Sequence, residues 1–210
     1  MVKKMVEFTH LDFENYTRVE HGYLLIPSPD DKYLYLPEIY DRVCSIIHFS
    51  SKIGSKSDRS AISNKAFSEA MTRAALSEFV AVEEYIASYN PAYKGLWFNH
   101  KTNADPIFHM LKLLRNYNVH IDTSTLEKEK MRVKVAFGNQ EFDVEKHYIS
   151  NINLESLLKV KDSKFYLSIL PKMIAVFDEQ QREWGIDCLI IKCALDNMNN
   201  LDQMLCNTNP

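Results

Sequence analysis

Residues 105–121, DPIFHMLKLLRNYNVHI, combine a strongly apolar composition with side chains that could carry out chemistry. When these residues are placed about 100° apart around an α-helix, five polar ones fall in a strip roughly 80° wide. The strip consists of Asp105, His109, Lys112, Asn116 and His120. An imidazole transfers protons near neutral pH, so this segment is the candidate functional element.

Arg115 lies on the apolar side of the same helix, between Leu111 and Phe108. An unpaired guanidinium is costly in such a place, so Arg115 must pair with a carboxylate or reach round to the polar strip. Glu78 is one candidate partner, and Glu83 is another. An arginine beside a histidine is useful chemically, because the guanidinium binds a phosphate bidentately while the imidazole moves a proton.

Amphipathic periodicity predicts the helices that must position this one. A long helix is expected at about 61–88, where apolar residues recur at spacings of three and four, and Asn90-Pro91 ends it. Asp105 followed by Pro106 is typical of a helix start, and this helix should continue to about Ile121. Further helices are predicted from Pro37, at 154–160, from 165 to about 178 or further with Pro171 as a kink or in the first turn, and at about 185–205.

The remaining segments have different patterns. Residues 131–149 alternate apolar and polar residues around Gly138-Asn139, which predicts a β-hairpin. The charged run Glu127–Lys130 should form a solvated turn before it. Residues 1–36 are mixed, with two short apolar runs around Pro27–Asp31 that suggest two extended pieces joined by a turn. We therefore expect one domain over residues 1–210, mainly all-α. It would be a four- to five-helix bundle with a hairpin insertion at 131–149 and a mixed N-terminal extension at 1–50.

The composition excludes several classes of protein. Apolar residues make up 46% of the chain and charged residues 25%, a globular balance. The 5 glycines are far apart, which excludes the dinucleotide fingerprint, the P-loop and the G-x-S-x-G elbow. The net charge of −3 argues against binding nucleic acid by bulk electrostatics, although a transiently binding enzyme remains compatible with it. We expect no metal, no cofactor, no membrane span and a cytoplasmic protein with reduced cysteines.

Residues 115–120, RNYNVH, resemble the R-x(4–6)-H motif of the HEPN superfamily in its common R-N-x-x-x-H form. Arg42 and His48 also match the bare pattern, but only Arg115 is followed directly by asparagine. HEPN proteins are small helical bundles, and many are metal-independent endoribonucleases of toxin–antitoxin, anti-phage and RNA-processing systems. Their motif lies near the end of a helix, and dimerisation brings two such helices together.

The resemblance implies a role for each motif residue. His120 would act as general base on the ribose 2′-OH or as general acid on the leaving 5′-oxygen, and Arg115 would neutralise the scissile phosphate. The products would be a 2′,3′-cyclic phosphate and a 5′-OH. Asn116 would orient the imidazole or contact RNA, and His109 and Lys112 are candidates for contacts with the RNA backbone.

Dimerisation would also solve a geometric problem. Arg115 and His120 point about 140° apart on one straight helix, so a single copy presents them poorly together. We therefore expect a homodimer through the 105–121 helix, with an antitoxin or regulatory protein as a second kind of partner.

Other interpretations stay open at this point. The same dimeric face could belong to a non-catalytic HEPN-like module, and the chain could be a helical interaction protein unrelated to that superfamily. His120 could simply complement the helix dipole, and Arg115 could be a buried structural ion pair. Trp97 and His100 lie in a loop where they could pack or stack on a base.

Overall fold

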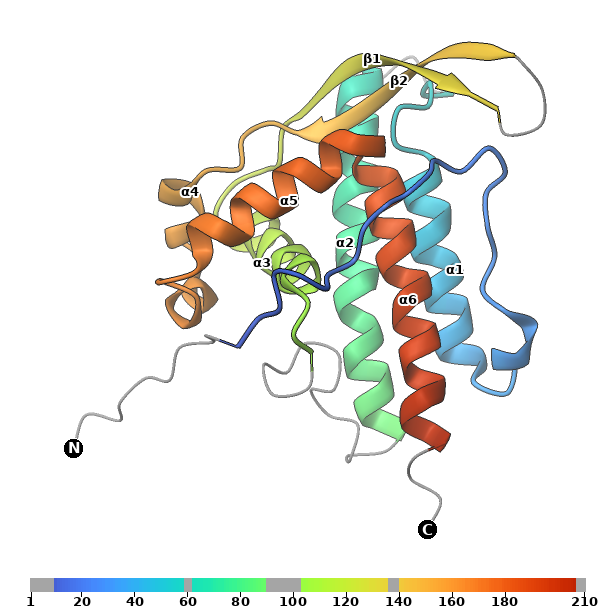
Figure 1. The fold of residues 1–210 in the computed structure, drawn as a ribbon, viewed down its shortest axis with the longest axis vertical. Coiled ribbons are helices and arrows are strands. Elements are labelled where there is room, and N and C mark those ends of the chain that lie inside the picture. The colour runs from blue at the N-terminus through green and yellow to red at the C-terminus, as the bar shows by residue number, and fades with distance from the viewer. Residues whose placement is uncertain (1–9, 59–61, 90–102, 136–139, 207–210) are drawn as a thin grey trace.

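A computed structural model describes residues 10–58, 62–89, 103–135 and 140–206 (Figure 1). Most of these residues are helical, and the two strands form one antiparallel hairpin. The α-helices are α1 (Pro37–Ser51), α2 (Asn64–Tyr89), α3 (Pro106–His120), α4 (Leu154–Leu158), α5 (Leu170–Trp184) and α6 (Ile186–Cys206). Two short 3-10 helices, η1 (Asp31–Tyr33) and η3 (Lys161–Phe165), and the strands β1 (Leu126–Lys134) and β2 (Glu141–Ile149) complete the fold. The mainly helical class and the hairpin are therefore confirmed.

Three long helices, α1, α2 and α6, lie side by side, and α3 and α5 pack across one side of them (Figure 1). The hairpin runs over the end of this assembly near the start of α6. Helix α3 contacts α2, α4, α5 and α6, so it is central. This central position explains its composition, since a helix that touches neighbours on most sides must be apolar on most sides.

Proline and glycine mark the boundaries that differ from the expected ones. The helix predicted from Phe165 begins later, because η3 ends at Phe165 and α5 begins only at Leu170, with Pro171 in its first turn. Gly185, with φ 103°, then ends α5 and lets α6 begin at once. A residue with a Cβ would be strained in that conformation.

The N-terminal segment contains no strand in the part that the structure describes, residues 10–36. Its backbone bonds to side chains instead. The N–H of Thr17 donates to Asp105 Oδ2 (2.8 Å), and that of Val19 donates to Gln180 Oε1 (3.4 Å). The two extended pieces expected around Pro27–Asp31 form no ladder either, because the second run is taken up by the short helix η1 and the turn that follows it.

The hairpin begins earlier than predicted. Met131 pairs with Val144, and the ladder extends back to Leu126 opposite Ile149. The run Glu127–Lys130, expected to be a turn, lies inside β1, because cross-strand ion pairs stabilise it there. Lys128 Nζ lies 2.8 Å from Glu145 Oε2, and Lys146 Nζ lies 3.1 Å from Glu129 Oε1. The turn predicted at Gly138-Asn139 lies outside the described residues.

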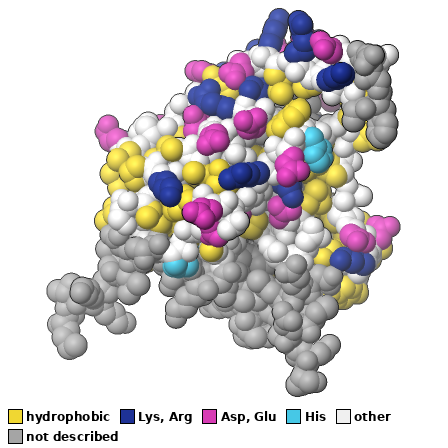
Figure 2. All heavy atoms as spheres, viewed as in Figure 1, with side chains coloured by type: hydrophobic (Ala, Val, Ile, Leu, Met, Phe, Trp, Pro, Cys, Tyr) yellow, Lys and Arg dark blue, Asp and Glu magenta, His cyan; other side chains and the backbone are white. Residues whose placement is uncertain are grey.

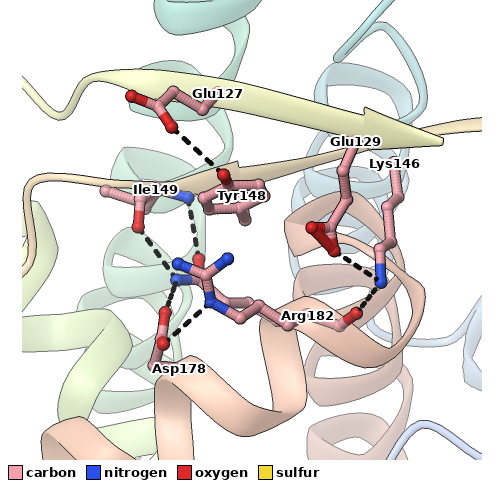
Figure 3. Close-up of polar contacts among 8 residues, drawn as sticks. Glu127, Glu129, Lys146, Tyr148, Ile149, Asp178 and Arg182 are labelled. Atoms are coloured by element: carbon pink, nitrogen blue, oxygen red, sulfur yellow. Dashed lines mark hydrogen bonds and ion pairs between the residues drawn. The ribbon is translucent and has the colours of Figure 1, made fainter.

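Polar side chains of α5 fasten the hairpin to the helices (Figure 3). Gln181, fully buried, accepts from the N–H of Ile149 and donates to its carbonyl, both at 2.9 Å. Arg182 stacks on the ring of Tyr148 and bonds Asp178 (2.8 Å), while Lys146 contacts the carbonyl of Arg182. Gln181 thus acts on β2 as a neighbouring strand would, by pairing both polar groups of one residue.

Replacing Gln181 with leucine tests this fastening. We expect Gln181→Leu to lower the free energy of unfolding by about 2–5 kcal/mol, because it leaves the buried N–H and carbonyl of Ile149 unpaired. Urea unfolding followed by circular dichroism measures the change, with the exposed neighbour substitution Glu179→Leu as the control. Equal stability of the two variants would contradict the role given to Gln181.

Candidate functional site

Arg115 and Asn116 form a short polar chain with Asp162 of η3. Arg115 Nη1 donates to Asn116 Oδ1 (3.0 Å), and Asn116 Nδ2 donates to Asp162 Oδ2 (2.9 Å). Arg115 makes no ion pair within the described part of the chain, and its Nε is buried without a hydrogen-bond partner. The guanidinium is thus held in position by a neutral amide, while its charge is not neutralised by a bonded carboxylate.

The two carboxylates considered as partners of Arg115 are engaged elsewhere. Glu78 pairs with Arg42 of α1, which also donates to Tyr85 Oη (2.9 Å). Glu83 lies 3.6 Å from Lys112 Nζ. The expected support of Arg115 by Glu78 is therefore replaced by an ion pair between α1 and α2. The sequence does not reveal this exchange, because it depends on which face of α2 the first helix covers.

His109 lies in the core instead of on the surface. Its exposed fraction is 0%, with Nδ1 at 2.7 Å from Tyr166 Oη and Nε2 at 2.8 Å from the carbonyl oxygen of Asn103. Burial raises the pKa of Tyr166, so its hydroxyl stays protonated and donates to Nδ1, while Nε2–H donates to the carbonyl. The expected contact between His109 and RNA does not fit this position, since the imidazole joins α3 to the segment after η3.

His120 is the last residue of α3 and is exposed. No contact joins it to Arg115 among the described residues, as the divergent directions of the two side chains predict. Asn116 uses its amide on Arg115 and Asp162, so it does not orient the imidazole within one chain. One copy of the protein therefore presents a fixed arginine and a separate, solvent-accessible histidine.

Exposed apolar side chains surround this end of α3. Val119 is 54% exposed and Ile121 39%, although both belong to an otherwise buried helix or its first following residue. Leu154 and Leu158, one turn apart on the neighbouring α4, are also exposed. Figure 2 shows hydrophobic side chains gathered where α4 lies in Figure 1.

Asp105 anchors the other end of α3. Its Oδ1 accepts from the N–H of Ile107 and its Oδ2 from that of Thr17, both at 2.8 Å. Burial nevertheless raises the pKa of this carboxyl, and its two N–H partners oppose that effect. The predicted N-cap is thus confirmed, with a second bond that ties down the N-terminal segment.

Within the described ranges, no group of three or more His, Cys, Asp or Glu side chains is arranged to hold a metal ion. No helix there is both long and apolar enough to span a bilayer. Trp97 and His100 lie outside the described residues.

In comparisons with known proteins, no protein family, curated protein or solved structure matches this chain. The function must therefore be inferred from the motif and from the arrangement of the side chains around α3.

Burial and the two N–H bonds shift the pKa of Asp105 in opposite directions, and their balance predicts how this residue's contribution to stability changes with pH. Because its folded-state pKa lies above the ordinary value of 3.8, its contribution to stability is full below about pH 4 and declines as the pH rises through the folded pKa. We expect the difference in unfolding free energy between wild type and Asp105→Asn to shrink from pH 4 to pH 8. Urea unfolding at a series of pH values measures it. A difference that grows with pH would show that the two N–H bonds outweigh burial.

Proposed function

We propose that this protein is a metal-independent endoribonuclease of the HEPN type. The observation that carries the proposal is Arg115, a half-buried guanidinium held by Asn116 and not neutralised by an ion pair within the described residues. Such a group binds an anion with little loss of side-chain entropy, and a phosphodiester suits its planar geometry. The R-N-x-x-x-H spacing then supplies His120 as the proton-transfer group.

In the proposed reaction, Arg115 binds the scissile phosphate and stabilises the charge that develops on it. His120 takes the proton from the ribose 2′-OH or gives one to the leaving 5′-oxygen. The 2′-oxygen attacks phosphorus as the bond to the 5′-oxygen breaks. The products are a 2′,3′-cyclic phosphate and a 5′-OH end.

A homodimer through α3 would complete this site. Arg115 and His120 do not meet in one chain, so the proposal combines Arg115 of one protomer with His120 of its partner. The exposed Val119 and Ile121 beside His120, with Leu154 and Leu158 of α4, offer an apolar surface that a second copy would cover. The helical arrangement is then that of a four- to five-helix HEPN bundle with a hairpin insertion.

The cellular setting is part of the same proposal. An enzyme that cuts RNA would act in the cytoplasm as a toxin or anti-phage component, and an antitoxin or regulatory protein would restrain it. The separation of Arg115 from His120 in one chain favours one alternative, a non-catalytic HEPN-like dimer that binds a partner through the same face.

RNA cleavage in excess EDTA tests the catalytic pair. We expect purified protein to cut total RNA, and His120→Ala and Arg115→Ala each to lower the rate at least about 100-fold, because general acid–base and charge-stabilising groups contribute on that scale. His48→Ala and Arg132→Ala are matched controls, since both residues are exposed and lie on other elements. Absence of cleavage by wild type would favour the non-catalytic dimer.

A mixture of the two inactive variants tests whether the site is shared. If Arg115 and His120 come from different protomers, a heterodimer of Arg115→Ala and His120→Ala contains one intact site of two. Random exchange of subunits should then restore about a quarter of the wild-type rate. A mixture that stays inactive after subunit exchange would place both groups in one chain.

The dimer surface has its own test. We expect Val119→Glu to raise the dimer dissociation constant at least about tenfold, because association would bury an unpaired carboxylate between two apolar faces. Sedimentation velocity measures the shift, with Leu24→Glu on the exposed N-terminal segment as the control. A wild-type protein that is monomeric at micromolar concentration would overturn the shared site.

A further inference from the structure

The outer edge of strand β1 carries backbone groups that the described part of the chain leaves unpaired. Successive residues of an antiparallel strand direct their N–H and carbonyl groups alternately toward the partner strand and away from it. Val135 donates its N–H to the carbonyl of Gln140 (3.1 Å), and Ser150 donates its N–H to that of Thr125 (2.9 Å). The register then directs the odd-numbered residues of β1 toward β2 and the even-numbered ones outward.

Side chains close this edge only where β1 begins. Leu126 donates its outward N–H to Glu69 Oε1 of α2 (3.4 Å), much as Ile149 at the end of β2 bonds Gln181. Beyond Leu126, no hydrogen bond reaches the outward backbone groups within the described residues. We call the remaining positions the β1 edge, and they are the exposed residues Lys128, Lys130, Arg132 and Lys134. Strand β2 separates this edge from α5 (Figure 3), and the strands continue beyond the helices (Figure 1).

All four side chains of the β1 edge are basic, and β2 neutralises only two of them. The ion pairs are Lys128 with Glu145 (2.8 Å) and Arg132 with Asp143 (3.3 Å) and Glu141 (4.0 Å). Lys130 and Lys134 make no ion pair within the described residues, since the carboxylates opposite them in the register pair with Lys128 and Arg132 instead. Both of these lysines are exposed, so each can bind a further carboxylate.

The other face of the same strands is apolar. Met131 lies opposite Val144, and Val133 lies opposite Phe142, so these four side chains share one face. Phe142 is 48% exposed and Val144 37%. The outer half of the hairpin thus presents a charged face and a partly exposed apolar face, with the open backbone of the β1 edge between them.

Strand β2 already shows which pattern suits β1. Its residues 141–145, EFDVE, alternate acidic and apolar side chains. The acidic ones lie beside the basic side chains of β1, and the apolar ones lie beside Met131 and Val133. A strand added to the β1 edge meets these same two faces from the other side, so the same alternation suits it.

A second copy of this chain does not fit the β1 edge. Two β1 edges side by side would oppose two basic rows, which is unfavourable. The outer edge of β2 in a second copy is acidic, but it continues the sheet with matching faces only if that copy is displaced by two strand spacings, about 10 Å. A single helix with its side chains is about that wide, so the helical parts of the two copies would overlap.

We propose that the β1 edge binds an extended segment of another protein as a third strand, and that this segment alternates acidic and apolar residues. The backbone of the segment pairs with the outward N–H and carbonyl groups of the edge, which is the usual mode of strand addition. Its carboxylates lie beside Lys130 and Lys134, and its apolar side chains extend the face formed by Met131 and Val133. The same lysines repel a basic strand, so the edge selects its partner by charge as well as by backbone pairing.

Three labelled synthetic peptides, titrated with the full chain, test the proposal. They are EVEVEVE, its basic counterpart KVKVKVK, and EEVVVEE, which has the composition of the first peptide without its alternation. We expect EVEVEVE to bind, and the other two to bind at least about tenfold more weakly. Fluorescence anisotropy at protein concentrations up to about 0.5 mM measures the affinities. The proposal is overturned if EVEVEVE does not bind, or if either of the other peptides binds as tightly.

Amide hydrogen exchange followed by NMR identifies the backbone groups that take part. In the free protein, the N–H groups of Lys130 and Arg132 should exchange faster than that of Met131, which the ladder protects. We expect saturating EVEVEVE to slow Lys130 and Arg132 to about the rate of Met131. Unchanged fast exchange at Lys130 and Arg132 with the peptide bound would show that no third strand forms.

Variants locate the site on the edge. Lys130→Pro removes an outward N–H and no bond of the ladder, so we expect it to abolish binding of EVEVEVE. If this variant loses the hairpin, Lys130→Glu decides, and it should weaken binding at least about tenfold through repulsion between carboxylates. Lys159→Glu, the same change at an exposed residue after α4, is the matched control. Equal affinity of Lys130→Glu and Lys159→Glu would overturn the assignment.

This inference goes beyond the ribonuclease proposal and is independent of it. Arg115→Ala and His120→Ala should bind EVEVEVE as the wild type does, because α3 makes no part of the β1 edge. Loss of RNA cleavage and loss of peptide binding can therefore be told apart.

Discussion

The two hydrogen bonds to the carboxylate of Asp105 hold together the parts of this molecule that function would need. One oxygen starts α3 by accepting from Ile107, and the other fixes the N-terminal segment by accepting from Thr17. The helix that begins there carries Arg115 and His120 at its far end, while the segment held by Thr17 runs on to α6, where Thr17 also bonds Asp196. One carboxylate thereby fixes both the start of α3 and the path of the N-terminal segment across the helices.

Charge neutralisation separates Arg115 from three other basic side chains of the long helices. Arg42 meets Glu78, Lys112 meets Glu83, and Lys192 meets Asp196. Each of those pairs joins turns of one helix or two packed helices, and so has a structural explanation. Arg115 has an amide where the others have a carboxylate. The proposed binding of a phosphate would account for this difference in a helix where an uncompensated charge is otherwise a cost.

Local patterns predicted much of the fold, whereas contacts between distant segments escaped them. Asp105-Pro106 located the start of α3 because capping depends on adjacent residues, and alternation located the hairpin. The burial of His109 could not be predicted, because its partner Tyr166 lies 57 residues further along the chain. The hydrogen bond between Thr17 and Asp196 was missed for the same reason, since the two residues are 179 positions apart. A histidine on a polar strip indicates proton transfer only when the strip reaches solvent, as it does at His120 and not at His109.

The pairing of Gln181 with Ile149 also bears on the order in which the chain is made. A ribosome releases β1 and β2 before α5, so the hairpin emerges while the residue that completes its inner edge is still 32 positions behind. An isolated two-stranded hairpin is only marginally stable in water. During that interval the N–H and carbonyl of Ile149 can pair with another strand, including one from a second nascent chain on the same mRNA. The spacing between β2 and α5 thus determines how long the edge of β2 stays unpaired during translation.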